Sequence, residues 1–317
     1  MLAACGLDRL LGDPSRWLHP VQIIGAAIEQ LRRWAEAWAG DRPLRLRLAG
    51  VAITLVVVGV SAAAGWALEQ LARLLPWLGL PLLLLGLASA LAGRSLALAV
   101  EAVLQPLEAL PPQLALARQR LALIVGRDVQ QLPAPELLRA AAETAAENGV
   151  DGLFAPLFWM LLGAGICGLL PLAPGPLALA WAFKASSTLD SMLGYRQGRL
   201  RWLGTAGARL DDLLTWIPCR LTALSLGQLL PALADGAADP SPNAGVSEAA
   251  YAHQLGIRLG GDNYYGGMLR AKPLLNASGK AVSAANVRQI LGLNRRICLL
   301  WLLISGVIAA TSQGLKL

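Results

Sequence analysis

Between residues 143 and 220, ionisable and amide side chains stand among segments that otherwise have the apolar character of membrane helices. Three stretches carry most of them: AENGVDG (146–152), STLDSMLGYR (187–196) and GARLDDLLTWIPCR (207–220). A carboxylate that is buried or next to a membrane is costly unless it is paired, bound to a metal or facing water. We therefore expect these side chains to do chemistry, and we interpret the protein as an enzyme rather than a membrane scaffold.

The composition predicts the fold class. The chain has 317 residues, of which 56% are hydrophobic and only 15% are charged, and its mean hydropathy is +0.53. Soluble domains are closer to a quarter charged. The apolar runs are continuous and rich in Leu and Ala, which disfavours a transmembrane barrel with its alternating polarity. We predict an all-α, multi-pass membrane protein whose polar layer of helices and loops faces the cytoplasm, forming one domain over residues 1–317.

Apolar runs predict membrane spans near residues 48–68, 74–91, 153–170, 213–233 and 297–310. The span at 213–233 contains Pro218 and Arg220, so we expect a broken, re-entrant or bundle-facing helix there. A helix that begins near Pro135 should end at Asn148-Gly149 as a C-cap. Polar loops are expected at 184–209 and 258–296 on the cytoplasmic face, and the number of crossings is left open.

The charge and the cysteines limit the function further. The net charge of +7 indicates either arginines that hold the topology or cations that bind an anionic substrate. No long basic run suggests nucleic acid. The scattered cysteines are interpreted as packing residues of a reducing compartment, and with two histidines any metal should be a hard cation held by oxygen ligands. We expect no cleavable signal peptide, because Met1 is not followed by a basic region.

Further polar elements complete a pattern along the chain. These are GDP (12–14) followed by His19, then Gly126-Arg127-Asp128, SPNAG (241–245) and LGGDNYYGG (259–267). In this order and spacing, and together with the three stretches above, they resemble the CobD/CbiB family of cobalamin biosynthesis. The resemblance runs from Asp8 to about Arg296. The family's members are integral membrane enzymes regarded as adenosylcobinamide-phosphate synthases.

The sequence departs from the family pattern at three places. The family commonly reads AENTSDG, where this chain has Gly149-Val150 in place of the Thr-Ser pair. Ser187 stands where Asn is usual, and Ser247 stands where a proline often precedes the glutamate. Any hydroxyl role at 149–150 is therefore absent, which affects details of substrate contact more than the reaction.

The resemblance implies an ATP-dependent ligase that joins a propionate carboxyl of adenosylcobyric acid to the amine of an aminopropanol phosphate or a related amino alcohol. The corrinoid is a substrate, activated most plausibly as an acyl phosphate, with Mg²⁺ as cofactor. The chain should lie in the cell membrane with its active site on the cytoplasmic face, beside other late enzymes of the pathway. For such a reaction the side chains suggest roles, which are hypotheses: Glu147, Asn148 and Asp151 for catalysis, Asp190, Asp211 and Asp212 for the metal, Lys184, Tyr195, Arg196, Arg209 and Arg220 for ATP, and His19, Asn243, Glu248, Tyr264 and Tyr265 for substrate.

Structural alternatives stay open for several of these residues. Asp211 suits the cap of the helix that follows it. Arg220 binds phosphate or pairs internally with Asp211 or Asp212. His19 is either a packed turn residue or a proton carrier. The two tyrosines lie against a corrin face or anchor the chain at the membrane interface. Glu143 and Glu147 share a helical face that could be a solvated acidic stripe.

Two other classes of function are weaker. A prenyltransferase would require a DDxxD motif, whereas in this chain Thr215 occupies the fifth position of the motif that Asp211-Asp212 would begin. A CDP-alcohol phosphotransferase wants its AR pair soon after DG, whereas Ala208-Arg209 lies far from Asp151-Gly152. A transporter or structural partner would be supported by an inverted repeat, and none is evident.

Overall fold

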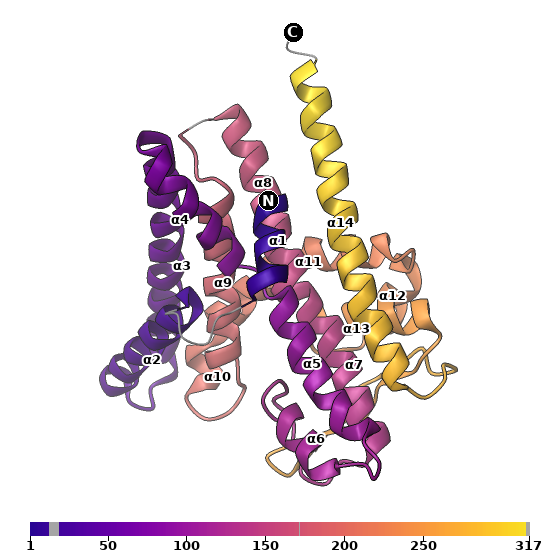
Figure 1. The fold of residues 1–317 in the computed structure, drawn as a ribbon. Coiled ribbons are helices and arrows are strands. Elements are labelled where there is room, and N and C mark those ends of the chain that lie inside the picture. Colours follow the sequence, from indigo (N-terminus) through magenta and orange to yellow (C-terminus); the bar gives the residue numbers. More distant parts are fainter. Residues whose placement is uncertain (13–18, 171, 315–317) are drawn as a thin grey trace. The chain divides into compact units, whose positions relative to one another are not determined.

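The computed structural model describes residues 1–12, 19–170 and 172–314, and most of them are helical (Figure 1). Asp13 and Pro14 of the GDP motif lie outside the described residues. Contacts divide the chain into two compact units, which are Met1–Ala92 with Ala155–Thr215, and Gly93–Phe154 with Trp216–Leu317. The single domain over 1–317 stays a prediction.

Among the described residues, four helical segments are long and apolar enough to cross a membrane: Pro43–Leu74, Pro76–Glu108, Ala134–Leu169 and Ala284–Thr311. The chain is thus an all-α protein of the multi-pass membrane type. The spans predicted at 48–68, 74–91, 153–170 and 297–310 fall in or across these segments. The one predicted at 213–233 is not among them, because one helix ends at Ser225 and the next begins at Leu229.

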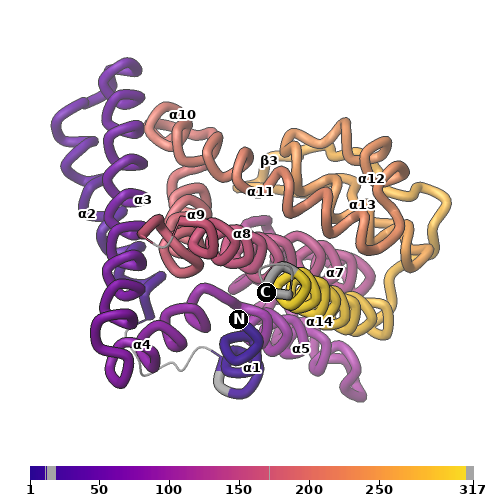
Figure 2. Tube along the Cα trace, turned by 90° about the horizontal axis from the view of Figure 1, so that it is seen from above, coloured from indigo at the N-terminus to yellow at the C-terminus, as the bar shows by residue number. Residues whose placement is uncertain are grey.

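The first unit is built around α3, which lies beside α9 (Figures 1 and 2). Apolar side chains of α2, α3, α9 and α10 form a common core, which includes Ile28, Ile53, Leu189 and Leu203. The helices of this unit are α1 (Leu2–Leu11), α2 (Pro20–Ala39), α3 (Pro43–Leu74), α4 (Pro76–Ser89), α8 (Ala155–Leu169), α9 (Pro176–Leu193), α10 (Leu200–Leu203) and the first half of α11 (Thr205–Ser225).

The loop predicted to begin at Lys184 is wrong, because α9 continues to Leu193. Ala185, Leu189 and Leu193 are all buried, and their spacing of four residues places them on one face of a helix. The polar residues of KASSTLDSM lie between these positions, so the polar composition of the segment hid the helical spacing of its apolar residues. The consequence is that Asp190 is held on a packed helix rather than on a loop.

The N-terminus of α9 is fixed by a carboxylate from α3. Glu69 is 4% exposed and lies inside a candidate membrane span. Its Oε2 accepts a hydrogen bond from the backbone N–H of Gly175 at 2.8 Å, and its Oε1 accepts from those of Leu177 and Ala178 at 2.6 and 3.2 Å. The first N–H groups of a helix have no partner inside the helix, and a negative charge is favoured at that end. Glu69 therefore satisfies the start of α9 and is itself satisfied.

In the second unit, α5, α7 and α14 lie side by side (Figures 1 and 2). The predicted loop to residue 296 is wrong in part, because α14 already begins at Ala284. The elements are α5 (Gly93–Glu108), α6 (Leu114–Leu121), α7 (Ala134–Gly149), a π-helical turn (Val150–Phe154), α12 (Leu229–Gly236), α13 (Ala244–Leu255), α14 (Ala284–Gly314) and the strands β1 (Leu259–Gly260), β2 (Asn263–Tyr265), β3 (Met268–Arg270) and β4 (Leu274–Leu275).

The four short strands make two antiparallel ladders, β1 with β4 and β2 with β3. Tyr265 pairs with Met268 across a turn formed by Gly266 and Gly267, both with positive φ, as the tight turn of a hairpin requires. The glycine-rich segment LGGDNYYGG therefore belongs to a hairpin with a defined register.

Replacing Glu69 with alanine should lower the melting temperature of the detergent-solubilised protein by about 5 °C or more, since it leaves buried N–H groups of α9 without an acceptor. Glu69→Gln keeps one acceptor oxygen, so its melting temperature should lie between those of the wild type and Glu69→Ala. Glu36→Ala, which removes a surface ion pair with Arg32, should change little. An unchanged melting temperature in Glu69→Ala would contradict the role of this carboxylate.

Candidate functional site

A buried carboxylate on α7 is the centre of the second unit. Glu143 is 1% exposed. Its Oε1 accepts hydrogen bonds from Arg139 Nη1 at 2.8 Å and from the backbone N–H of Gly260 at 2.9 Å, and its Oε2 accepts one from Arg127. Glu143 is thus a doubly paired ion inside a candidate membrane span, and the alternative of a solvated acidic stripe is wrong for it.

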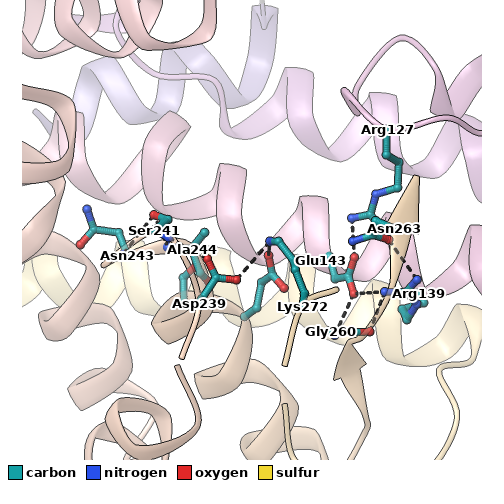
Figure 3. A network of polar contacts seen from close by, with 12 residues as sticks. Arg127, Arg139, Glu143, Asp239, Ser241, Asn243, Ala244, Gly260, Asn263 and Lys272 are labelled. Carbon is teal, nitrogen blue, oxygen red and sulfur yellow. Dashed lines mark hydrogen bonds and ion pairs between the residues drawn. The ribbon is translucent and has the colours of Figure 1, made fainter. Parts of the chain in front are cut away.

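The same two arginines hold the glycine-rich hairpin in place (Figure 3). Arg139 donates to the carbonyl of Gly260 at 2.6 Å, and both guanidinium groups donate to Oδ1 of Asn263, at 3.1 Å from Arg139 and 2.7 Å from Arg127. Asn263 is 3% exposed. We call Arg127, Arg139, Glu143, Gly260 and Asn263 the Glu143 network. It ties α7 to a segment more than a hundred residues further along the chain.

A second ion cluster adjoins this network (Figure 3). Lys272 Nζ lies 3.2 Å from Asp239 Oδ2 and 3.9 Å from Glu248 Oε1. The side chains of Asp239 and Glu248 are almost fully buried, and Glu147 on α7 interacts electrostatically with Lys272. We call these four residues the Lys272 cluster. Its carboxyl groups outnumber its single cation.

Burial and like charge shift the proton affinities in this cluster. Burial raises the pKa of Glu248 well above its ordinary value, the charge of Glu143 adds to this effect, and Lys272 opposes it. Burial alone would lower the pKa of Lys272, but the surrounding carboxylates, with Glu248 foremost, raise it instead. The cluster therefore keeps Lys272 charged, and Glu248 holds a proton more tightly than a glutamate exposed to water does.

The SPNAG segment forms the turn into α13. Ser241 Oγ accepts hydrogen bonds from the backbone N–H of Asn243 and Ala244 at 3.2 and 3.1 Å. Arg220 donates to Oδ1 of Asn243 at 2.6 Å and to the carbonyl of Pro242 at 2.7 Å, while its guanidinium lies 4.5 Å from the Trp216 ring. Arg220 therefore binds the turn, and its guanidinium does not form the ion pair with Asp211 or Asp212 that was the alternative.

The AENGVDG motif does not end its helix, and the predicted C-cap is wrong. Val150 keeps a right-handed helical conformation and begins the π-helical turn Val150–Phe154, which carries Asp151. Single π-helical turns inside α-helices occur frequently at functional sites. Glu147, Asn148 and Asp151 are half-buried at this turn.

The buried thiol next to this motif is not a nucleophile. Burial raises the pKa of Cys219 to about 12, and the charges of Asp151 and Glu147 contribute. A thiol with so high a pKa is not ionised at neutral pH, and the thiolate is the reactive form. The interpretation of Cys219 as a packing residue is consistent with this environment.

The departure at residue 149 has a local cause. A Cβ atom at Gly149 would lie 2.6 Å from Nδ2 of Asn294. Asn294 is buried, donates to the carbonyl of Ala145 at 3.0 Å and accepts from the hydroxyl of Tyr251. The amide of Asn294 thus occupies the space that a side chain at residue 149 would need, and glycine is the residue that leaves room for it.

A second group of ionisable residues lies in the first unit, on α9, α11 and the segment before α10. Burial, followed by the charge of Asp212, raises the pKa of Asp190. Burial also raises the pKa of Asp212, and the nearby charges of Arg209 and Arg196 oppose that rise. We call these four residues the Asp190 group. Glycine at residue 194 leaves room for the Asp190 side chain, because a Cβ atom there would lie 2.1 Å from Asp190 Oδ1.

The described residues contain no group of three or more His, Cys, Asp or Glu side chains placed to hold a metal ion. Asp190 and Asp212 are close enough to influence each other, and Asp211 is buried within α11. Because α11 begins at Thr205, Asp211 is not a helix cap. A magnesium site would therefore have two neighbouring carboxylates at most from the Asp190 group.

The remaining predicted residues are placed as follows. His19 is the N-cap of α2, where its Nδ1 accepts from the backbone N–H of Val21 at 3.3 Å. Lys184 is half-buried on α9, and Tyr195 is exposed after its end. Tyr264 is exposed on β2, and Tyr265 lies 5.1 Å from the guanidinium of Arg270. Their assignments to substrate or ATP stay predictions.

Sequence reasoning missed the site roles of Arg127, Arg139, Asp239, Asn263 and Lys272. Arg127 and Asn263 stood in quoted motifs without a role, and Glu143 lies one turn of helix after Arg139. The rarity of lysine was the one sequence signal that could have pointed to Lys272. Most cations of the chain are arginines, and its four lysines are Lys184, Lys272, Lys280 and Lys316.

Comparison with known proteins decides the family. The model of the CobD/Cbib protein family matches residues 1–294. The chain belongs to the CobD/CbiB family. The chain is 44% identical to "Cobalamin biosynthesis protein CobD" of Synechocystis, with 97% of this chain and 91% of that protein covered. It is 40% identical to the protein of the same name from Citrobacter koseri (93% and 90% covered) and 39% to "Cobalamin biosynthesis protein CbiB" of Salmonella typhimurium (93% and 90%). No solved structure matches.

Membership of the CobD/CbiB family, together with the names of these relatives, supports a role in cobalamin biosynthesis. The family model covers the first unit and the second unit as far as residue 294, and the Asp190 group, the Glu143 network and the Lys272 cluster all lie within the matched residues.

The raised pKa of Glu248 predicts a pH-dependent stability. A carboxyl group whose folded-state pKa is raised stabilises the fold at acidic pH, and this contribution is lost as the pH rises through the folded pKa. In Glu248→Gln that loss is absent, and Lys272 keeps its partner Asp239. The melting temperature of Glu248→Gln relative to wild type should therefore increase between pH 5 and pH 9.

The exposed Asp262→Asn variant removes the same charge and serves as the control, with an expected flat difference across this range. A flat profile for Glu248→Gln as well would show that Glu248 carries no excess proton in the folded protein.

Proposed function

We propose that this chain forms the amide bond between a propionate carboxyl of adenosylcobyric acid and the amine of (R)-1-amino-2-propanol O-phosphate or a related amino alcohol, with ATP as co-substrate. Membership of the CobD/CbiB family supports the pathway. The structure supports the reaction class, because it contains a phosphate-compatible group in one unit and a proton-binding ion cluster in the other. The second of these observations carries the proposal.

The proposed reaction has two steps. The corrinoid carboxylate attacks the γ-phosphorus of ATP, which breaks the bond to ADP and leaves an acyl phosphate. The neutral amine then attacks the acyl carbon, the amide bond forms and inorganic phosphate leaves. One proton must be removed from the incoming ammonium before or during this attack, so the site needs an acceptor whose pKa is near the working pH.

The Lys272 cluster and the π-helical turn supply candidates for that acceptor. Asp151 lies in this turn and Glu147 shortly before it, and burial raises the pKa of Glu248, so that its carboxylate accepts a proton at a higher pH than an exposed glutamate does. An excess of buried carboxyl groups over lysine favours a second ammonium group as a ligand. We assign the binding and deprotonation of the amine to these residues.

The Asp190 group fits the phosphates of ATP. Magnesium in proteins is commonly held by one or two carboxylates together with substrate phosphates and water, and Asp190 and Asp212 provide such a donor pair. Arg196 and Arg209 interact with Asp212 and suit phosphate oxygens, because the guanidinium matches them with two parallel hydrogen bonds. When bound, Mg²⁺ would neutralise phosphate charge.

We place the reaction on the cytoplasmic face of the cell membrane, close to other late enzymes of the pathway. Arg42, Arg45 and Arg47 lie at the start of the first candidate span, and cytoplasmic segments carry an excess of such residues. ATP and both organic substrates are polar or charged, which agrees with an aqueous site.

The direct test incubates purified full-length protein with ATP, Mg²⁺, adenosylcobyric acid and competing amines, namely aminopropanol phosphate, aminopropanol and ethanolamine phosphate. Mass spectrometry should detect one amide product, and ADP should be released in equal amount. Carboxyl-¹⁸O substrate should transfer label to inorganic phosphate. Release of AMP and pyrophosphate would exclude the acyl phosphate, and the absence of any amide would exclude the proposal.

Variants Asp190→Asn and Asp212→Asn should lower kcat by about 100-fold or more, because phosphoryl transfer depends on charge neutralisation at the phosphates. They should still insert into membranes. Glu29→Gln on the surface of α2 is the control, and wild-type activity in either Asp variant would refute the assignment.

A further inference from the structure

The first unit carries a belt of tryptophans and arginines around the start of α3. Trp34 and Trp38 on α2 are 62% and 58% exposed. The guanidinium of Arg45 lies 5.4 Å from the Trp38 ring, and those of Arg47 and Arg201 lie 4.4 and 4.9 Å from the ring of Trp202 on α10. We call Trp34, Trp38, Trp202, Arg45, Arg47 and Arg201 the Trp-Arg belt.

The helix α2 has two apolar faces. One packs into the unit through residues such as Ile28, Ala35 and Ala39. The other exposes Trp34, Trp38 and Ile23, and Figure 1 shows α2 running obliquely to the lower end of α3. Exposed tryptophans next to a candidate span are typical of the membrane–water interface, where an amphipathic ring lies at the level of the headgroups.

The arginines of the belt lack acidic partners. Arg32 and Arg33 pair with glutamates of α2, and Arg199 pairs with Asp41. By contrast, within residues 1–12, 19–170 and 172–314 the guanidinium groups of Arg45, Arg47 and Arg201 form no ion pair or hydrogen bond, and all three arginines are exposed. Two of them share one ring, so positive charge is concentrated rather than neutralised.

Stacking on an aromatic ring uses the face of a guanidinium group and leaves the N–H groups at its edge available. Those edge donors match two oxygens of a phosphate group. The ring of Trp202 packs against the buried core of α2, α3, α9 and α10, so it holds Arg47 and Arg201 in a fixed place. The belt thus presents preorganised phosphate donors at the end of a membrane helix.

We propose that the Trp-Arg belt binds the headgroups of anionic phospholipids. The positive charge of the arginines favours an anionic ligand. Because the belt adjoins the candidate span Pro43–Leu74, we expect this anion to be the headgroup of a lipid in the adjacent leaflet. Juxtamembrane arginines are attracted to the negative surface of anionic membranes. The site is independent of the Asp190 group and of the amide-forming reaction.

The test uses full-length protein in a neutral detergent, titrated with phosphatidylglycerol or with phosphatidylcholine of the same chain length. Thermal unfolding and native mass spectrometry report binding. Wild type should be stabilised by phosphatidylglycerol but not by phosphatidylcholine, and 0.5 M salt should weaken the effect because exposed charges are screened. Arg45→Gln/Arg47→Gln/Arg201→Gln should need about tenfold or more phosphatidylglycerol for half of the effect.

The control Arg32→Gln/Arg33→Gln/Arg120→Gln removes the same charge elsewhere and should behave as wild type. Equal stabilisation by both lipids, or an unchanged response in the belt variant, would overturn the proposal. Equal stabilisation by inorganic phosphate at matched concentration would also overturn it, since the belt would then be a site for soluble anions.

If the glutamine variant does not fold, the wild-type protein still decides the question. Brominated phosphatidylglycerol should quench tryptophan fluorescence more strongly than brominated phosphatidylcholine, and Trp34→Phe/Trp38→Phe/Trp202→Phe should lose that excess. Equal quenching by the two lipids in wild type would refute selective binding.

Discussion

The ionised carboxylate of Glu143 inside an apolar helix is the constraint on which the second unit depends. A buried charge is tolerated only when it is paired and its lone pairs are satisfied, and here two arginines and one backbone N–H fulfil that requirement. Meeting it brings the segment around Gly260 and Asn263 onto α7. Lys272 follows two residues after that hairpin, so the position of the Lys272 cluster depends on the same contacts.

Glu69 meets the same requirement in the first unit by capping α9. Both residues use their carboxylates for internal support and have none of their oxygens left for a substrate. Glu147 and Asp190 differ, because no hydrogen bond of their carboxylates is formed among the residues that the structure describes, and both are half-buried. Of these four residues, two therefore support the fold and two have carboxylates that are available for chemistry.

The sequence predicted the all-α class and the location of four apolar segments, because continuous hydrophobic runs of this length have few alternatives in a membrane. It did not predict the helices over 184–193 and 284–296, since their polar residues hide the period of their buried positions. The motif residues were found by resemblance and not by geometry. The partners Lys272 and Asp239 were missed because they contact each other across 33 residues of sequence without any local pattern.

Gly149 and Asn294 share one small volume between α7 and α14, and only one of them has a side chain in it. A threonine at residue 149 would require the space that is now filled by the amide of Asn294. Evolution at these two positions should be correlated: a bulkier residue at the first demands a smaller or displaced one at the second, together with a new arrangement for the hydroxyl of Tyr251. In this chain, the need for glycine at residue 149 thus comes from a residue nearly 150 positions away along the sequence.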